Sequence, residues 1–547
     1  MTVATTTTAS PIAESPKPQP QPRSRHGARA VAANVIWNWA GIIVTMGTGV
    51  VIAPFLIHRL GESVYGLWIL IAALTGYFGL LDLGIRGSVG RYIAFHRAQQ
   101  DFNAVNSVLN TALVLLCGVA GVACIATLIA VWVFPHVFEI PAGYHNPARI
   151  ALLIVGLNLA LTFPVAIFDS VLWALQRFDL LNIVDIPIGI LRTILVFYFI
   201  GRGDGLISLA VIAIAMTALA AVIKAIMSFW IEPQLRLNLR FASMATSKKI
   251  YGYGIWSFLL AAAREGRGQL SPVLIGAMLN VSVVTIYSIA SRLIGYATQF
   301  VIASTGVLTP VATTLHAQEK TGHQQKLFVE GGKYCSAVSL YFALLFIVLG
   351  RSLIHLWVGP ELVAQGAGTL LDILVLGEII PMSQWVTYSM ILGMAKHKLS
   401  AWVAVVEVFI MVVLMIVLVK PLGLVGVCLA VAVAGLLCRG VFQVVYGCHL
   451  MRVSVWTYFI EAILRPTVIA TVTGAGLWLM AEKHAPDTWL KLFIYGISFS
   501  LIYFAFALVA LGGYEHARAY LDRKRKARQA AAPASEEPAA IDAVPGV

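Results

Sequence analysis

The sequence predicts an all-α, polytopic membrane protein with about 14 transmembrane helices. Of its 547 residues, 59% are hydrophobic and 12% are charged, whereas soluble globular proteins carry about 25% charged residues. Apolar stretches of about 20 residues, the length that crosses a bilayer as a helix, recur from Val31 to Gly512. This excess of apolar residues requires a lipid environment.

Polar residues, prolines and glycines separate the apolar stretches and set the boundaries of the expected helices. The first seven lie at 31–57, 64–85, 104–134, 148–174, 183–200, 206–230 and 251–279. The second seven lie at 283–315, 334–357, 368–392, 401–419, 425–449, 465–481 and 490–512. The connections between them are short, so we expect no soluble domain inside the membrane region.

Lysine and arginine gather in alternate connections, as the positive-inside rule describes for cytoplasmic loops. This pattern predicts that both ends of the chain are cytoplasmic and that the number of spans is even. The formal net charge of +13 is spread over many short loops and forms no single stripe. A nucleic-acid partner is therefore not expected.

A weak internal repeat suggests how the helices are organised. The stretch Pro54–Trp68 aligns with Pro272–Tyr287 when one gap is allowed, and both stretches place Pro-x-Leu-Ile before a short connection. Many transporters consist of two related halves with the substrate site between them. We therefore expect two six-helix lobes, at 31–230 and 251–449, followed by two additional helices at 465–512.

The two ends of the chain have a different composition from the middle. Residues 1–30 are rich in Thr, Pro and Gln, and residues 513–547 begin with a basic run and continue with Ala, Pro and Glu. Neither segment has an apolar face that it can bury. Both are expected to be disordered cytoplasmic tails.

Motifs of enzymes are missing from the sequence. It contains no G-x-x-x-x-G-K-[ST], H-E-x-x-H or D-x-D pattern. The six cysteines lie in or beside apolar spans without the paired spacing of a zinc site. We expect no catalytic residues, no metal site and no cofactor, and hence a protein that is not an enzyme.

Several short motifs follow one another between Asn34 and Ala94. They are Pro54 ahead of a predicted outer turn, Leu60-Gly61, Tyr65-Gly66-Leu67-Trp68, Leu81-Asp82-Leu83-Gly84, and Ser88-Val89 followed by Arg91-Tyr92. Two further patches are VVTIYSIASRL at Val283–Leu293 and WALQRF at Trp173–Phe178. In these motifs the chain resembles the polysaccharide-transporter and O-antigen flippase family of the multidrug/oligosaccharidyl-lipid/polysaccharide exporter superfamily.

The resemblance implies a function and a location. Such a protein would carry an undecaprenyl-diphosphate-linked oligosaccharide from the cytoplasmic to the periplasmic leaflet of a bacterial inner membrane, by alternating access between its two lobes. The cargo would serve the synthesis of O-antigen lipopolysaccharide, capsule or exopolysaccharide. Its partners would be the lipid-linked oligosaccharide, membrane lipids, and the polymerase and glycosyltransferases of the same pathway.

Three alternative functions stay open. A multidrug exporter of the same superfamily would carry organic cations, and a lipid II flippase would differ only in its cargo. A membrane-embedded sugar polymerase or ligase is the third alternative. The short outer connections disfavour it, because they leave little room for an outer active site.

Arginines deep in the apolar spans are the candidate substrate ligands. A charged residue at the middle of a span costs roughly 2.5 to 3.5 kcal/mol on insertion scales, so its presence needs a reason. Arg264 and Arg267 share a face of the seventh span, and Arg292 reaches a similar depth on the eighth. Three guanidinium groups at one level are suited to binding a diphosphate. The alternative is that they are structural and pair with buried acids such as Asp372, Glu378 or Glu407 on the tenth and eleventh spans.

Other charged residues at depth have separate candidate roles. Glu265, Glu378 and Glu407 are candidates for coupling transport to H⁺ or Na⁺, since a carboxylate in a low dielectric gains a tendency to take up a proton. Arg192 and Arg439, each alone on its span, rank behind the three arginines as phosphate ligands.

Asp82 and Arg91 lie at the inner end of the second span and in the elbow that follows it. They are candidates for an inner gate. The favoured interpretation is structural: the pair caps a helix end and anchors the elbow at the membrane interface.

Overall fold

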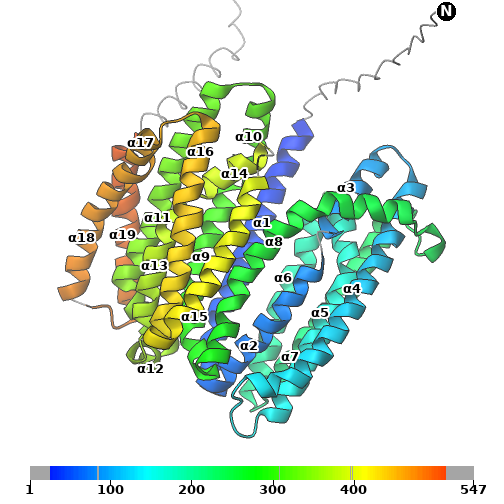
Figure 1. Cartoon of the computed structure of the whole chain (residues 1–547), viewed down its shortest axis with the longest axis horizontal. Helices are drawn as coiled ribbons and strands as arrows, with labels where there is room; N and C mark the ends of the chain where they lie inside the picture. Colours follow the sequence, from blue (N-terminus) through cyan, green and yellow to red (C-terminus); the bar gives the residue numbers. More distant parts are fainter. Residues whose placement is uncertain are drawn as a thin grey trace, which may run out of the picture.

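The fold is a bundle of long helices, seen in a computed structural model of the chain (Figure 1). The structure describes residues 25–512 apart from 83–84, 176, 307, 395, 397 and 484, and it leaves out some further side chains, among them those of Asp82 and Arg264. The predicted tails lie outside the described residues, except that residues 25–30 form the first turns of α1. The described part contains helices and no strands.

The helices of the first half are α1 (Arg25–Leu60), α2 (Glu62–Phe78), η1 (Gly79–Asp82), α3 (Ile85–Ala98), α4 (Phe102–Val137), α5 (His145–Ala174), α6 (Phe178–Gly201), α7 (Leu206–Ile231) and η2 (Leu239–Phe241). The second half continues with α8 (Met244–Met278), α9 (Val281–Thr305), α10 (Leu308–Ala317), α11 (Thr321–Val358), α12 (Pro360–Ala364), α13 (Ala367–Ser383), α14 (Trp385–Gly393) and α15 (Lys398–Gly435). The last elements are the π-helix η3 (Leu436–Phe442), α16 (Gln443–Met451), α17 (Val455–Tyr458), the π-helix η4 (Phe459–Leu464), α18 (Arg465–Lys483) and α19 (Trp489–Ala510).

Every predicted apolar segment coincides with a helix. Eleven helical runs of the described chain are long and apolar enough to cross a membrane. The difference from fourteen has three sources. Helix α2 has only 17 residues, α8 carries charged residues in its middle, and two predicted spans form one 54-residue run, Lys398–Met451. The predicted fold class, an all-α polytopic membrane protein, is confirmed.

The run Lys398–Met451 is a hairpin of two antiparallel spans. Its turn is at Gly423, whose φ of 56° lies in the left-handed region that favours glycine, and Pro421 just before it interrupts the helical hydrogen bonds. Glu407 and Arg439, which lie equally far from this turn, contact each other at 2.7 Å. The hairpin thus places side chains of two spans at the same depth.

The helices form two groups. In the first, α4 packs on α5, α5 on α7, and α6 on both α1 and α7. In the second, α13 contacts α9, α11 and α15, while α18 packs on α11 and α19. Figure 1 shows the groups side by side, with α8 crossing from one to the other. Both ends of the described chain lie at one edge of the molecule, here called the tail edge (Figure 1).

The two groups meet at the opposite edge, where the α1–α2 turn packs on the α8–α9 turn. The hydroxyl oxygens of Ser63 and Ser282 are 2.6 Å apart and share a hydrogen bond. The Thr285 hydroxyl donates to the carbonyl oxygen of Glu62 at 2.7 Å. These contacts join the starts of α2 and α9.

The contact between the two turns is internally symmetric. Ser63 and Ser282 occupy equivalent places in the internal repeat, and so do Gly66 and Thr285. A Cβ atom at Gly66 would lie 2.1 Å from the carbonyl oxygen of Val281, so only glycine permits this approach. Each contact has a counterpart with the two turns exchanged, as in an isologous interface between two subunits. The structure therefore supports the internal repeat.

Large apolar side chains cover the outer surface of the helices. Trp132, Phe409 and Val509 are 68%, 69% and 71% exposed, and many other Val, Ile, Leu and Phe residues are similar. A soluble monomer rarely exposes contiguous apolar surface on this scale. These faces are suited to contact with lipid.

Candidate functional site

A central cavity of about 810 Å³ lies between the two helix groups. Helices α1, α2 and α6 line it on one side, and α9 lines it on the other. Two glycines of α1 permit the close packing around it. A Cβ at Gly41 would lie 2.5 Å from Asn182 Oδ1, and one at Gly49 would lie 2.5 Å from the Tyr296 hydroxyl. The volume is in the range of small-molecule binding sites.

Two arginines reach this cavity, one from each group of helices. Arg192 lies roughly 20 Å from the tail-edge end of α6, and Arg292 lies roughly 17 Å from the opposite end of α9, at ~1.5 Å per residue. Both are therefore near the middle of the membrane. Among the described side chains, neither arginine forms an ion pair with an acid. Their charges are directed at the cavity.

Aromatic side chains surround Arg292. Its guanidinium interacts electrostatically with the phenol groups of Tyr65 and Tyr296. Tyr65 is 1% exposed, and its hydroxyl has no hydrogen-bond partner in the described part of the chain. A buried hydroxyl without a partner is costly, so it marks a place where a ligand oxygen can accept a hydrogen bond.

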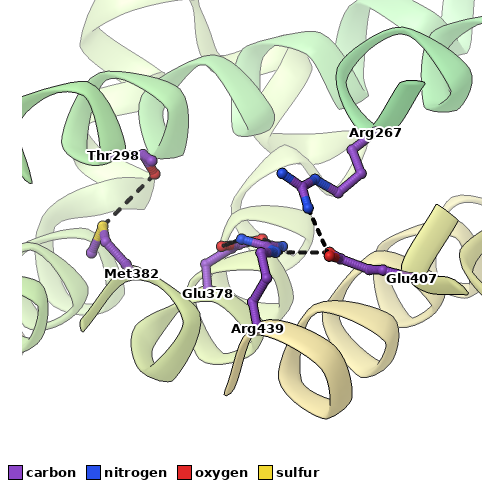
Figure 2. Close-up of polar contacts among 6 residues, drawn as sticks. All are labelled: Arg267, Thr298, Glu378, Met382, Glu407 and Arg439. Carbon is purple, nitrogen blue, oxygen red and sulfur yellow. Dashed lines mark hydrogen bonds and ion pairs between the residues drawn. The ribbon is translucent and has the colours of Figure 1, made fainter. Parts of the chain in front are cut away.

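A chain of ion pairs crosses the second group of helices (Figure 2). Arg439, on η3, makes two hydrogen bonds to the Glu378 carboxylate of α13, at 2.8 and 2.6 Å. Its Nε donates to Glu407 of α15 at 2.7 Å, and the other Glu407 oxygen accepts from Arg267 of α8 at 2.7 Å. Two acids and two arginines thus alternate, and their formal charges cancel.

The ion-pair chain borders a smaller cavity of about 270 Å³. Arg267, Glu407 and Arg439 line it together with the aromatic rings of Trp385 and Tyr388, among others. The carboxylate of Glu407 is only 2% exposed. The arrangement therefore places buried charges beside the smaller cavity while remaining neutral as a whole.

The structure separates the arginines that the sequence placed at one level. Arg267 lines the smaller cavity and Arg292 the central one. The reason is the direction of the side chains. The Arg267 face of α8 packs on α15, whereas the Arg292 face of α9 is directed at α1 and α2. The side chain of Arg264 lies outside the described residues.

The remaining predicted residues are dispersed. Glu265 is half-buried on α8 and interacts with another group, and it is not among the lining residues of either cavity. Arg91 is exposed on α3 and also has an interaction partner, while the side chain of Asp82 lies outside the described residues. Their predicted roles in coupling and gating stay predictions.

Two of the arginines that line the cavities ranked low in the sequence analysis. Arg192 and Arg439 were placed behind the other arginines because each is alone on its span. In each case the signal was present, because a single cation in an apolar span must be paired or must face water. Only the three-dimensional packing shows which of these applies.

Comparison with known proteins gives the family. The family model described as "Polysaccharide biosynthesis protein" matches residues 31–316, which is more than half of the chain. The chain belongs to this family. The predicted family is thereby confirmed, and the protein is a multi-pass membrane protein of the polysaccharide-transporter type.

Two relatives align with most of this chain. An uncharacterized membrane protein, EpsK of Bacillus subtilis, is 23% identical over 90% of this chain and 98% of its own length. A putative O-antigen transporter of Shigella flexneri is 19% identical over 73% of this chain and 93% of its own length.

Solved structures agree on the fold. An inward-facing multidrug resistance transporter of the MATE family has a TM-score of 0.62, with 14% identity over 75% of this chain and 98% of the other. The lipid II flippase MurJ in an inward closed conformation also has a TM-score of 0.62, with 14% identity over 87% of this chain and 98% of the other. At such low identity, the likeness establishes the fold alone.

The neutral ion-pair chain gives a prediction about stability. Glu407→Gln leaves the buried Arg267 without a carboxylate, and breaking a buried pair in this way costs about 3–5 kcal/mol. We expect a thermal unfolding midpoint several degrees below that of the unmodified protein, measured in detergent. Glu361→Gln, at an exposed position of α12, is the control and should melt normally.

A double variant separates charge balance from packing. Arg267→Met combined with Glu407→Gln removes one charge of each sign, so it should recover part of the lost stability. The interpretation is wrong if Glu407→Gln melts like the unmodified protein, or if the double variant melts below the single one.

Proposed function

We propose that the protein carries a lipid-linked oligosaccharide across a bacterial inner membrane and holds it by its diphosphate in the central cavity. The cargo would be an undecaprenyl-diphosphate-linked glycan that moves from the cytoplasmic to the periplasmic leaflet. The single observation that carries the proposal is the pair Arg192 and Arg292, which face one cavity from two sides without partner acids among the described side chains.

The chemistry of a diphosphate matches this pair. A guanidinium stays charged at any physiological pH and presents forked donors to phosphate oxygens. The Tyr65 hydroxyl adds a donor beside Arg292. Organic cations, the cargo of a multidrug exporter, would be repelled by two arginines that form no ion pair among the described side chains. The same features would suit lipid II, so the identity of the glycan is not part of the proposal.

Arg267 is not part of the proposed diphosphate site. Its guanidinium already binds Glu407 at 2.7 Å, and it lies in the other cavity. A phosphate there would have to displace a carboxylate that is almost fully buried. The family membership and the absence of enzyme motifs favour a transporter without catalytic activity.

Removal of the arginines tests the diphosphate site. Arg192→Gln and Arg292→Gln should each weaken binding of undecaprenyl diphosphate about tenfold, because each removes charge-assisted hydrogen bonds worth about 1.5–3 kcal/mol. Binding is measured in lipid nanodiscs by native mass spectrometry. Arg202→Gln is the control, because Arg202 stacks on Tyr198 near the opposite edge. Unchanged binding by the double variant would refute the proposed site.

The contact between the two turns suggests how access alternates. It joins the two groups at the edge opposite the chain ends. We propose that release of the cargo at that edge requires the contact to separate. The symmetry of the contact is suited to such a motion, because the α1–α2 turn and the α8–α9 turn can move apart symmetrically.

A cysteine pair tests this motion. The hydroxyls of Ser63 and Ser282 are close enough that Ser63→Cys with Ser282→Cys should form a disulfide on oxidation. Oxidation is expected to stop flipping in reconstituted vesicles, and reduction is expected to restore it. The two single-cysteine variants control for the native thiols. Flipping at the normal rate by the cross-linked protein would exclude a gate at this contact.

We also propose that Glu378 and Glu407 couple transport to an ion gradient, H⁺ being the simpler partner. A proton taken up by either acid weakens its bond to Arg439 and leaves a positive charge beside the smaller cavity. Vesicles with an imposed pH or Na⁺ gradient test this idea. The rate should respond to the pH gradient, and Glu378→Gln should remove the response. A transport rate that responds to neither the pH gradient nor the Na⁺ gradient would rule out coupling.

A further inference from the structure

A second cluster of charges lies inside the first group of helices. Lys224 of α7 contacts an oxygen of Asp169 on α5 at 2.7 Å and an oxygen of Asp185 on α6 at 2.8 Å. The Lys224 side chain is 9% exposed, whereas those of Asp169 and Asp185 are 43% and 53% exposed. The lysine is therefore an internal counter-ion, and the carboxylates remain accessible.

The accessible carboxylates line a side cavity of about 330 Å³ between α5, α6 and α7. This side cavity and the central cavity share three lining residues, Asp185, Gly189 and Arg192. The three are spaced along one face of α6, roughly 10 Å from first to last at ~1.5 Å per residue. Gly189 adds no side-chain bulk to the face of α6 that the two cavities share, because glycine has no side chain.

The chemistry of the side cavity is that of a sugar site. Carboxylates accept hydrogen bonds from hydroxyl groups, and such charge-assisted bonds are stronger than neutral ones. Thr162 and Thr217 also line the cavity, and their hydroxyls donate to backbone carbonyls of their own helices. A metal cation is a poor fit, because the Lys224 ammonium already occupies the place between the two acids where such an ion would bind.

We propose that the side cavity binds the hydroxyl groups of the sugar next to the diphosphate, with Asp169 and Asp185 as acceptors. The inference rests on the proposed function, since it places the diphosphate at Arg192 and Arg292. From there, the sugar reaches past Gly189 toward the two carboxylates. Lys224 is a positioning residue, which holds both acids in place and balances part of their charge.

Gly189 offers a selective test. A Cβ atom there would meet no other atom within 4 Å, so a side chain can be added at this position, and Gly189→Leu places bulk between the two cavities. Two probes are compared in nanodiscs: undecaprenyl diphosphate and the same lipid carrying one N-acetylglucosamine. Gly189→Leu should weaken binding of the sugar-bearing probe at least fivefold more than it weakens binding of the bare diphosphate.

Two further variants complete the design. Asp169→Asn keeps the size of the side chain and should also weaken only the sugar-bearing probe. Gly121→Leu, at a position of α4 that is likewise free of neighbours, is the matched control and should affect neither probe. The sugar site would be overturned if Gly189→Leu and Asp169→Asn weakened binding of both probes equally, or if they weakened binding of neither probe. Failure of the diphosphate site has a different signature, namely that Arg192→Gln and Arg292→Gln leave both probes unaffected.

Discussion

Charges inside the membrane must be compensated, and this constraint organises the interior of the protein. A charge at the middle of a bilayer is stable only beside an opposite charge or in a wet cavity. Glu378, Arg439, Glu407 and Arg267 compensate one another in an alternating chain. Arg192 and Arg292 have no such partners among the described side chains. They are therefore the groups with charge available for an anionic ligand.

The same constraint separates the roles of the two helix groups. The ion-pair chain links α8, α13, the α15 hairpin and η3. It therefore holds these helices together, and its formal charges cancel. The central cavity lies between the groups and takes one arginine from each. A ligand held by both arginines bridges the groups. Its binding would thus be linked to their relative position, and the turn contact at the opposite edge joins the same two groups.

The sequence predicted the spans well but left open whether the arginines bind a ligand or pair with acids such as Glu407, for a physical reason. Hydrophobicity is local, so each apolar segment could be located without knowledge of its neighbours. The depth of Arg292 also followed from helix geometry. The direction of a side chain around the helix axis depends on packing between distant segments, as for Arg267 and Glu407, which are 140 residues apart. For that reason Arg267 was grouped with Arg292, and Arg192 was underrated.

The most direct test is a structure of the protein with undecaprenyl diphosphate bound in a nanodisc. The central claim predicts that the diphosphate lies in the central cavity, with phosphate oxygens within hydrogen-bond distance of Arg192 and Arg292, and that the pair Arg267–Glu407 stays intact. A diphosphate bound at Arg267 or Arg439, with their contacts to Glu407 broken, would contradict the claim.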